Sequence, residues 1–209
     1  YEWFTCKEFR QAMSCLLNRE RIISQVYNGL AEPCLYLFPT PNAFYNENIT
    51  LQYLFDRKKA EKLLSKAGMK KDSSGILRDK HNNPVEFDLT ITAESTVSSD
   101  IATIIVDECK KVGIKINIRT TDFQKLVEQM TSTYNWQSLF VSLGTTIFPS
   151  QGSNVWPSNT PLHIWYPMQP EPATEWEARI DFLYNEGSCT IEHDKAKVIW
   201  DEYQSIILE

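Results

Sequence analysis

The sequence predicts an α/β fold in which a central mixed β-sheet is flanked by helices. Three observations support this prediction. Segments that alternate apolar and polar residues, as half-buried strands do, recur through the middle of the chain with helical segments between them. Capping signals stand ahead of apolar stripes at helical spacing. A proline-rich, irregular segment then precedes two further helical segments near the C-terminal end.

The first elements of the chain are predicted to be helices. Thr5 opens a capping-box pattern ahead of one apolar stripe, and Asn18 opens a second helix that Gly29 ends. Residues 33–45 contain three prolines among many apolar side chains, so we expect an irregular connector that packs against the rest of the protein. Asp56 is then expected to cap a third helix with lysines on its outer face.

The middle of the chain is predicted to alternate strands and helices. Residues 75–78 and 85–92 are expected to form a hairpin-like pair, because a polar turn separates them and the second segment has a period of two. The elements expected next are a helix from Ser98 or Ser99 to Gly113, a strand over residues 114–119, a short helix from Asp122 and a strand over residues 136–143. Right-handed crossovers between the strands would place the helices over the sheet.

Regular structure is expected to stop over residues 149–172, which hold six of the ten prolines. Thr174 then starts a helix whose inward stripe includes Trp176 and which Gly187 ends. Thr190 begins the last helix. The order of elements therefore places the proline-rich loop between a sheet and a helix pair.

The composition excludes several classes of protein. A net charge of −6 disfavours a nucleic-acid binder, which normally carries a basic excess. No stretch approaches the roughly 18 consecutive apolar residues that a membrane span needs. The seven glycines form no phosphate-binding pattern, and no cofactor is expected.

Residues that could carry chemistry are scattered along the chain. The three histidines and five cysteines show no metal-ligand spacing, and the serines stand in no nucleophile motif. Each cysteine lies in or beside an apolar segment, so buried structural thiols are expected. We therefore predict neither a metal site nor a catalytic constellation. The aromatic, proline-rich loop near the strand ends is the better candidate for ligand binding.

Two blocks of the sequence resemble a known protein family. The first runs from Phe9 to Pro33 and is similar to the pattern "vRqA…iDReaIi…v..G.g.pa". The second runs from Phe55 to Phe87 and resembles "yDpekAkaLLaeAG…dGilr..dGkplef". Both patterns are typical of family 5 of the extracellular solute-binding proteins, which are the oligopeptide- and dipeptide-binding components of bacterial ABC importers.

The resemblance implies that residues 1–209 are one excised lobe, the C-terminal ligand-binding lobe of a two-lobed protein of the periplasmic-binding-protein-like (type II) fold. Its partners would be the missing N-terminal lobe, an extended peptide or other small solute in the cleft between the lobes, and the membrane permease of an ABC importer. The location would be the periplasm, or the outer face of the cytoplasmic membrane with a lipid anchor. No enzymatic activity is implied.

The resemblance also implies ligand-binding residues. The candidates are Phe123, Gly144, Thr145, Thr146, Asn154 and Trp156. Phe123 matches the position of a cleft-facing aromatic residue, although a core position in its helix is the alternative; Trp156 could equally cover the domain's own core. Peptide-binding members often carry an aspartate after the third strand, which pairs with the amino terminus of the peptide. Residues 143–149 contain no acid, which argues against recognition of a free amino terminus.

Two other functions fit the same residues. The fold of this family also accommodates nickel complexes, haem and oligosaccharides, so the solute could be one of these. The chain could instead be an enzyme domain that a missing partner domain completes. A convergent acid and base with perturbed pKa values would favour the enzyme, whereas a cleft lined by backbone groups and aromatic side chains would favour solute binding.

Overall fold

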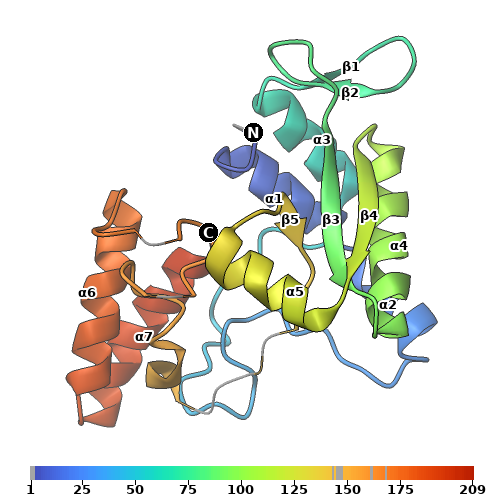
Figure 1. Cartoon of the computed structure of the whole chain (residues 1–209). Helices are drawn as coiled ribbons and strands as arrows, with labels where there is room; N and C mark the ends of the chain where they lie inside the picture. The colour runs from blue at the N-terminus through green and yellow to red at the C-terminus, as the bar shows by residue number, and fades with distance from the viewer. Residues whose placement is uncertain (1–2, 143, 145–147, 161, 168) are drawn as a thin grey trace. The chain divides into compact units, whose positions relative to one another are not determined.

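The computed structural model describes residues 3–142, 144, 148–160, 162–167 and 169–209. The chain divides into two compact units, and each has its own hydrophobic core (Figure 1). The first unit comprises Tyr1–Pro33, Tyr53–Gln129 and Asn135–Val141, and the second comprises Cys34–Gln52, Met130–Tyr134 and Ser142–Glu209.

The first unit contains the sheet and the helices around it. Its helices are α1 (Lys7–Leu16), α2 (Arg19–Val26), α3 (Arg57–Lys66), α4 (Thr96–Lys111) and α5 (Phe123–Glu128). A π-helical turn (Gln129–Thr133) continues α5, and from Met130 on it belongs to the second unit. Its strands are β1 (Lys70–Lys71), β2 (Leu77–Arg78), β3 (Glu86–Thr92), β4 (Lys115–Thr121) and β5 (Ser138–Leu139). Strands and helices alternate from β3 to β5, as the sequence predicts.

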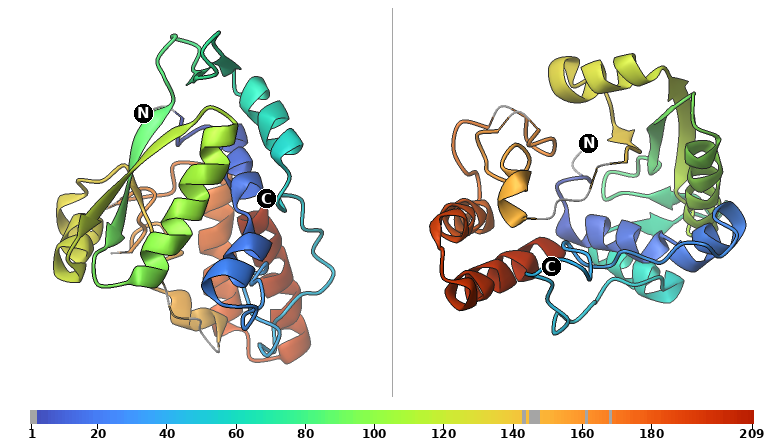
Figure 2. Two further views of the ribbon diagram at one scale, coloured as in Figure 1. Left: turned by 90° about the vertical axis from the view of Figure 1, so that its right-hand side faces the viewer. Right: turned by 90° about the horizontal axis from the view of Figure 1, so that it is seen from below.

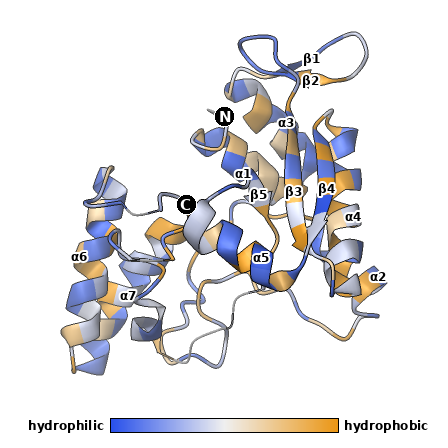
Figure 3. Cartoon of the chain, viewed as in Figure 1, coloured by the Kyte–Doolittle hydropathy of each residue, from blue (hydrophilic) through white to orange (hydrophobic). Residues whose placement is uncertain are grey.

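The main sheet is parallel and has the order β4-β3-β5. Helix α4 connects β3 to β4 and lies along the sheet (Figures 1 and 2). Apolar and polar residues follow one another along β3 (Figure 3). Phe87, Leu89 and Ile91 are buried in the core, whereas Asp88 lies on the other face and accepts a hydrogen bond from Asn117. The alternation read from the sequence is therefore the alternation between core and polar face.

Side-chain caps fix several helix starts. The side chain of Asn18 accepts a hydrogen bond from the backbone N–H of Arg21 at 3.0 Å, and Asp56 accepts one from Lys59 at 2.9 Å. Both caps confirm the predicted starts. The prediction for Thr5 is wrong, because α1 begins at Lys7 after Cys6, whose side chain makes no capping bond.

Two expectations for the middle of the chain need correction. Helix α4 starts at Thr96, not beyond Ser98, because Ser95 is the residue that accepts the capping bond. The hairpin-like pair is reduced to a single bridge between Arg78 and Pro84. Strand β2 pairs with β1 in a separate antiparallel sheet, and β3 pairs in parallel with strands that lie later in the sequence.

The second unit is built on two long helices. Helices α6 (Glu175–Cys189) and α7 (His193–Leu208) lie side by side (Figure 2), and a 3-10 turn (Pro149–Gly152) precedes them. Their core includes Trp200 and Tyr203, against which Phe38 packs with ring centroids 6.4 Å from each. Phe38 belongs to the connector 33–45, so the prediction that this connector is packed down is confirmed.

Three predicted features of the C-terminal helices are wrong. Gly187 does not end α6 but lies inside it. A glycine is needed there because a Cβ atom would come within 2.6 Å of the Trp200 ring. Trp176 is 43% exposed and does not face the core. Thr190 is the C-cap of α6, and α7 starts only at His193.

The third strand and the cysteines also differ from expectation. Strand β5 comprises only Ser138–Leu139, much shorter than the predicted 136–143, and Leu143 lies outside the described residues. Cys15 and Cys109 are buried, as expected for structural thiols, and burial raises the pKa of Cys109 to about 12. Cys34 and Cys189 are exposed, so the expectation of burial fails for them.

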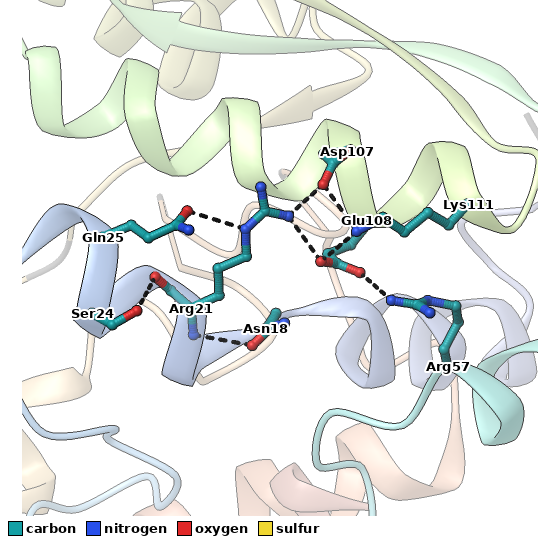
Figure 4. Close-up of polar contacts among 8 residues, drawn as sticks. All are labelled: Asn18, Arg21, Ser24, Gln25, Arg57, Asp107, Glu108 and Lys111. Carbon is teal, nitrogen blue, oxygen red and sulfur yellow. Dashed lines mark hydrogen bonds and ion pairs between the residues drawn. The ribbon is translucent and has the colours of Figure 1, made fainter.

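A buried carboxylate joins three helices of the first unit (Figure 4). Glu108 of α4 is 2% exposed at its side chain, and its oxygens accept hydrogen bonds of 2.9 Å from Arg21 of α2, Arg57 of α3 and Lys111 of α4 itself. The neighbouring Asp107 pairs with Arg21 and Lys111 as well. Both lone-pair edges of the Glu108 carboxylate are therefore satisfied by cations, which a buried charge requires.

The charge of Glu108 stabilises the folded state only while it is ionised. Burial raises its pKa, but the hydrogen bonds from Lys111, Arg57 and Arg21 outweigh this effect and lower the pKa from 4.5 to about 2. A pKa below the unfolded value means that the unfolded chain binds the proton first as the pH falls. The stabilisation is fully present above about pH 4.5 and is lost as the pH falls towards 2.

We expect Glu108→Gln to lower the free energy of unfolding of the first unit by about 2–3 kcal/mol at pH 7, since the variant keeps the side-chain shape but removes the carboxylate partner of Arg57 and leaves Arg21 and Lys111 with Asp107 alone. Urea denaturation followed by circular dichroism measures this loss. Asp107→Asn is the matched control, and a smaller loss is expected because Asp107 is 43% exposed at its side chain. The difference between wild type and Glu108→Gln should shrink towards pH 2; a difference that is independent of pH would contradict the proposed role of the charge.

Candidate functional site

The carboxyl ends of the parallel strands form the candidate site of the first unit. Parallel sheets bind ligands at this edge because loops and helix N-termini converge there. The backbone N–H of Ala93 donates to Thr121 at 2.8 Å, so β3 and β4 stay paired to their ends. Asp122 then starts α5 by accepting a hydrogen bond from the N–H of Lys125 at 2.8 Å.

Glu94 holds the first residue of α5 at this edge. Its carboxylate accepts a hydrogen bond from the backbone N–H of Phe123 at 3.1 Å and one from the hydroxyl of Thr92. The bonds from Thr92, from the backbone N–H of Glu94 itself and from Phe123 lower the pKa of Glu94. An exposed, ionised carboxylate therefore stands beside Phe123 at the end of β3. Sequence reasoning missed Glu94, because its two hydrogen-bond partners, Thr92 and Phe123, lie in different elements, β3 and α5.

Phe123 is exposed rather than part of the core. Its side chain is 55% exposed, whereas Leu126, one turn later in α5, is 1% exposed. The alternative of a core position is therefore wrong for Phe123, since a helix as short as α5 has only one buried side. An exposed aromatic ring at a strand-end edge is available for contact with a ligand.

The aromatic loop, residues 149–172, is the candidate site of the second unit. The prediction that it lacks long regular elements is confirmed in its described residues, which contain the 3-10 turn and otherwise turns. The hydroxyl of Tyr184 in α6 donates to the carbonyl of Ser150 at 2.6 Å, and Asp181 accepts from the N–H of Ser158 at 2.9 Å. Helix α6 thus anchors the start of the aromatic loop at two places.

Trp156 packs on the core of the second unit with part of its surface exposed. Its ring lies 6.2 Å from that of Tyr203 in an edge-to-face arrangement and 5.6 Å from that of Trp165. Gly152 has its α-carbon against the Trp156 ring, since a Cβ atom there would lie 2.9 Å from the indole. These contacts fit the interpretation of Trp156 as a cover for the core. Because its ring is only partly buried, contact with a ligand stays a prediction.

The other predicted site residues lie in different parts of the chain. Asn154 is exposed in the aromatic loop, and its carbonyl accepts a hydrogen bond from the N–H of Leu162 at 2.9 Å. Gly144 is exposed and has open space where a Cβ atom would stand. Thr145 and Thr146 lie outside the described residues. The structure therefore places Asn154 and Trp156 in one loop of the second unit and Phe123 at the sheet edge of the first.

Four further residues of the aromatic loop and α6 were not among the predicted ligand-binding residues, although Trp165, like Trp156, stands out in the sequence as an aromatic residue that could contact a ligand or cover the core. Trp165 and Tyr166 are 41% and 50% exposed, whereas His163 and Glu177 are buried. The capping box that begins at Thr174 does identify Glu177 in the sequence, but only as a helix-capping residue. Its contacts to the aromatic loop depend on the tertiary structure, which no local pattern encodes.

The site offers surfaces for binding. No cluster of three or more His, Cys, Asp or Glu side chains with metal-ligand geometry occurs among the described residues. None of the helices in the described part of the chain is long and apolar enough to cross a bilayer. Exposed aromatic side chains, a strand-end edge and a carboxylate at a helix start can hold a solute by stacking, backbone hydrogen bonds and charge.

Comparison with known proteins identifies a family match. Residues 1–163 match the family described as bacterial extracellular solute-binding proteins, family 5 Middle. The chain is 34% identical over 161 residues to the probable ABC transporter-binding protein of Deinococcus radiodurans, and the matched segment covers 73% of this chain and 27% of that protein. It is 30% identical over 153 residues to the oligopeptide-binding protein AppA of Bacillus subtilis, with coverage of 72% and 28%.

Solved structures show the same fold. The structure of AppA from Bacillus subtilis in complex with a nonapeptide matches with a TM-score of 0.86 at 25% identity, over 100% of this chain and 40% of AppA. NikZ from Campylobacter jejuni in complex with Ni(L-His) matches with a TM-score of 0.84 over 100% of this chain and 41% of that chain. At 17% identity the likeness to NikZ concerns the fold alone. The predicted fold class is confirmed, and the chain spans less than half the length of each protein.

We expect Phe123→Ala to change the free energy of unfolding by less than about 0.5 kcal/mol, because the exposed ring is not part of a packed core. The matched variant Leu126→Ala should cost about 2–4 kcal/mol, since Leu126 is fully buried in the same helix. Urea denaturation at pH 7 compares the two. A loss above about 2 kcal/mol for Phe123→Ala would show that its ring packs in the core and would remove Phe123 from the candidate site.

Proposed function

Because this chain belongs to the bacterial extracellular solute-binding proteins of family 5, we propose that it forms the C-terminal lobe of the substrate-binding component of an ABC importer. The family match over residues 1–163 carries this proposal. The limited share of each relative that the chain covers, 27% and 28% in the two curated proteins, supports the view that a second lobe belongs to the same protein.

We propose an extended peptide as the ligand. AppA is named as an oligopeptide-binding protein. Its structure with a nonapeptide contains a part that has the same fold as this chain, and that part covers the whole length of this chain. An extended peptide can be held by backbone hydrogen bonds of the strand type, while its side chains enter separate pockets. The candidate contacts for the peptide are the sheet edge around Phe123 in the first unit and, in the second unit, the aromatic loop around Asn154 and Trp156. Gly144, Thr145 and Thr146 are further candidates.

Binding would be coupled to transport by closure of two lobes. A ligand that contacts both lobes stabilises the closed state over the open state by its extra contacts, and a permease can distinguish the two states. This role requires no bond making or breaking, which agrees with a family of binding proteins. We place the protein in the periplasm or, with a lipid anchor, on the outer face of the cytoplasmic membrane.

We expect the 209-residue chain alone to bind peptides weakly, because one lobe offers only part of the contacts of a closed cleft. Equilibrium dialysis against a random nonapeptide pool, followed by mass spectrometry, should show retention by the full-length protein and little by the chain alone. A sub-micromolar dissociation constant for the chain alone would contradict the one-lobe proposal. Retention of metal complexes or oligosaccharides instead of peptides, in the same assay with mixed solutes, would contradict the peptide ligand.

Recognition of a free amino terminus should be weak in the full-length protein. Residues 143–149 supply no carboxylate to pair with an ammonium group, and the carboxylate of Glu94 already accepts hydrogen bonds from Thr92 and from the backbone of Phe123. A buried ammonium without a counter-charge is unfavourable. Peptides that are retained from the pool should therefore bind within about threefold of the same affinity before and after amino-terminal acetylation, a difference below roughly 1 kcal/mol. A loss of about a hundredfold on acetylation would contradict this prediction and indicate another carboxylate at the site.

A further inference from the structure

A second buried carboxylate lies at the start of α6, in the unit that carries the aromatic loop. Glu177 is 4% exposed and occupies the third position of the helix, after the capping residue Thr174. The hydroxyl of Thr174 donates to Glu177 Oε2 at 2.7 Å, and the backbone N–H of Glu177 donates back to that hydroxyl at 3.3 Å. These two contacts are all that a helix cap needs.

Side chains of the aromatic loop add contacts that capping does not require. Trp165 Nε1 donates to Glu177 Oε1 at 3.3 Å, and Gln169 Nε2 donates to Glu177 Oε2 at 3.4 Å. The ring of His163 is buried, with its Nε2 3.8 Å from Glu177 Oε1 and its Nδ1 3.2 Å from the carbonyl of Val155. Three side chains from a span of seven residues therefore converge on one carboxylate.

The charge of Glu177 depends on these donors. Burial raises the pKa of the carboxyl group, but the hydrogen bonds from Thr174, Gln169 and Trp165 and the nearby His163 outweigh burial and lower the pKa. The helix N-terminus also favours a negative charge at this position. An ionised carboxylate with donors on both oxygens holds its partners more firmly than a neutral acceptor does.

The contacts of Glu177 determine how the aromatic rings of the loop are presented. Trp165 is tied at its indole nitrogen, while its ring lies 3.9 Å from His163 and 5.6 Å from Trp156. Trp165 nevertheless remains 41% exposed, and the next residue, Tyr166, is 50% exposed. A large aromatic side chain held in one orientation binds a ligand at a low entropic cost, whereas a free one does not.

We propose that Glu177 is a positioning residue, whose carboxylate holds the aromatic loop in the conformation in which Trp156 and Trp165 can contact the solute. This inference rests on the proposed function and adds to it a buried residue of α6 that need not touch the solute. The solute group that fits such a surface is an apolar or aromatic side chain of the peptide, which stacks on exposed indole rings.

The variant Glu177→Gln tests the proposal at the level of structure. Glutamine also serves at the third position of a capping box, so the helix start is preserved while the charge and one acceptor oxygen are lost. The matched control is Glu175→Gln, in the same turn, because Glu175 is exposed and has no side-chain hydrogen bond in the described part of the chain. We expect amide hydrogen exchange over residues 155–169 to be about tenfold faster in Glu177→Gln and unchanged in Glu175→Gln.

A second variant separates loop positioning from a general loss of folding. Trp165→Phe keeps a ring but removes the indole N–H, so it should also accelerate exchange in the aromatic loop while residues 180–189 of α6 remain protected. The tryptophan fluorescence change caused by Glu177→Gln should be largely absent in the Trp165→Phe background, because the two variants remove the same contact. Unchanged loop exchange in both variants, or faster exchange throughout α6, would overturn the positioning role.

Retention of peptides from the random nonapeptide pool by the full-length protein tests the functional half. Glu177→Gln should reduce retention about tenfold and Glu175→Gln should leave it unchanged. Faster loop exchange with unchanged retention would overturn the link between the aromatic loop and the solute, while leaving the proposed transport function intact. Absence of retention by the wild-type protein would instead refute the peptide-binding function, and the exchange experiment would still decide whether Glu177 positions the loop.

Discussion

The contact on which the first unit most depends is the one between Glu108 and its three cations. A carboxylate that is 2% exposed is tolerable only if its charge is compensated, and the compensation comes from two other helices as well as from α4. Displacing α2 or α3 would leave a buried charge with too few partners, so the arrangement of these helices is fixed by more than apolar packing. Because α4 links β3 to β4, the same contact restricts the strands whose ends form the candidate site.

The two buried carboxylates act at different levels of structure. Glu108 connects regular elements, whose backbones are already held by their own hydrogen bonds. Glu177 connects a helix to a loop that has little regular structure of its own. Side-chain hydrogen bonds therefore hold this loop in place, whereas backbone hydrogen bonds hold the strands and helices. The candidate site of the first unit is therefore held mainly by backbone hydrogen bonds, and that of the second unit mainly by side-chain contacts.

Sequence patterns located the elements well and their partners poorly. Asn18 and Asp56 were predicted as caps because a cap is a contact within four residues, which the local sequence fully encodes. The pairing of β3 was missed, since period two shows that a strand has two faces but not which strands lie beside it. Gly187 illustrates the same limit, because a glycine is required there by the close approach of Trp200 from another helix. The site residues that were missed are likewise defined by contacts between elements.

Two of the cations around Glu108 lie at positions where the sequence differs from the family pattern that it resembles. In the sequence block that resembles the family, Arg21 stands where the pattern has an alanine, and Arg57 stands where it has a proline. Neither alanine nor proline can donate a hydrogen bond from its side chain to a carboxylate. Solved relatives reach the same fold with TM-scores above 0.8 at 17–25% identity, so the fold tolerates wide change in sequence. The two arginines and Glu108 then add electrostatic stabilisation to one side of the first unit.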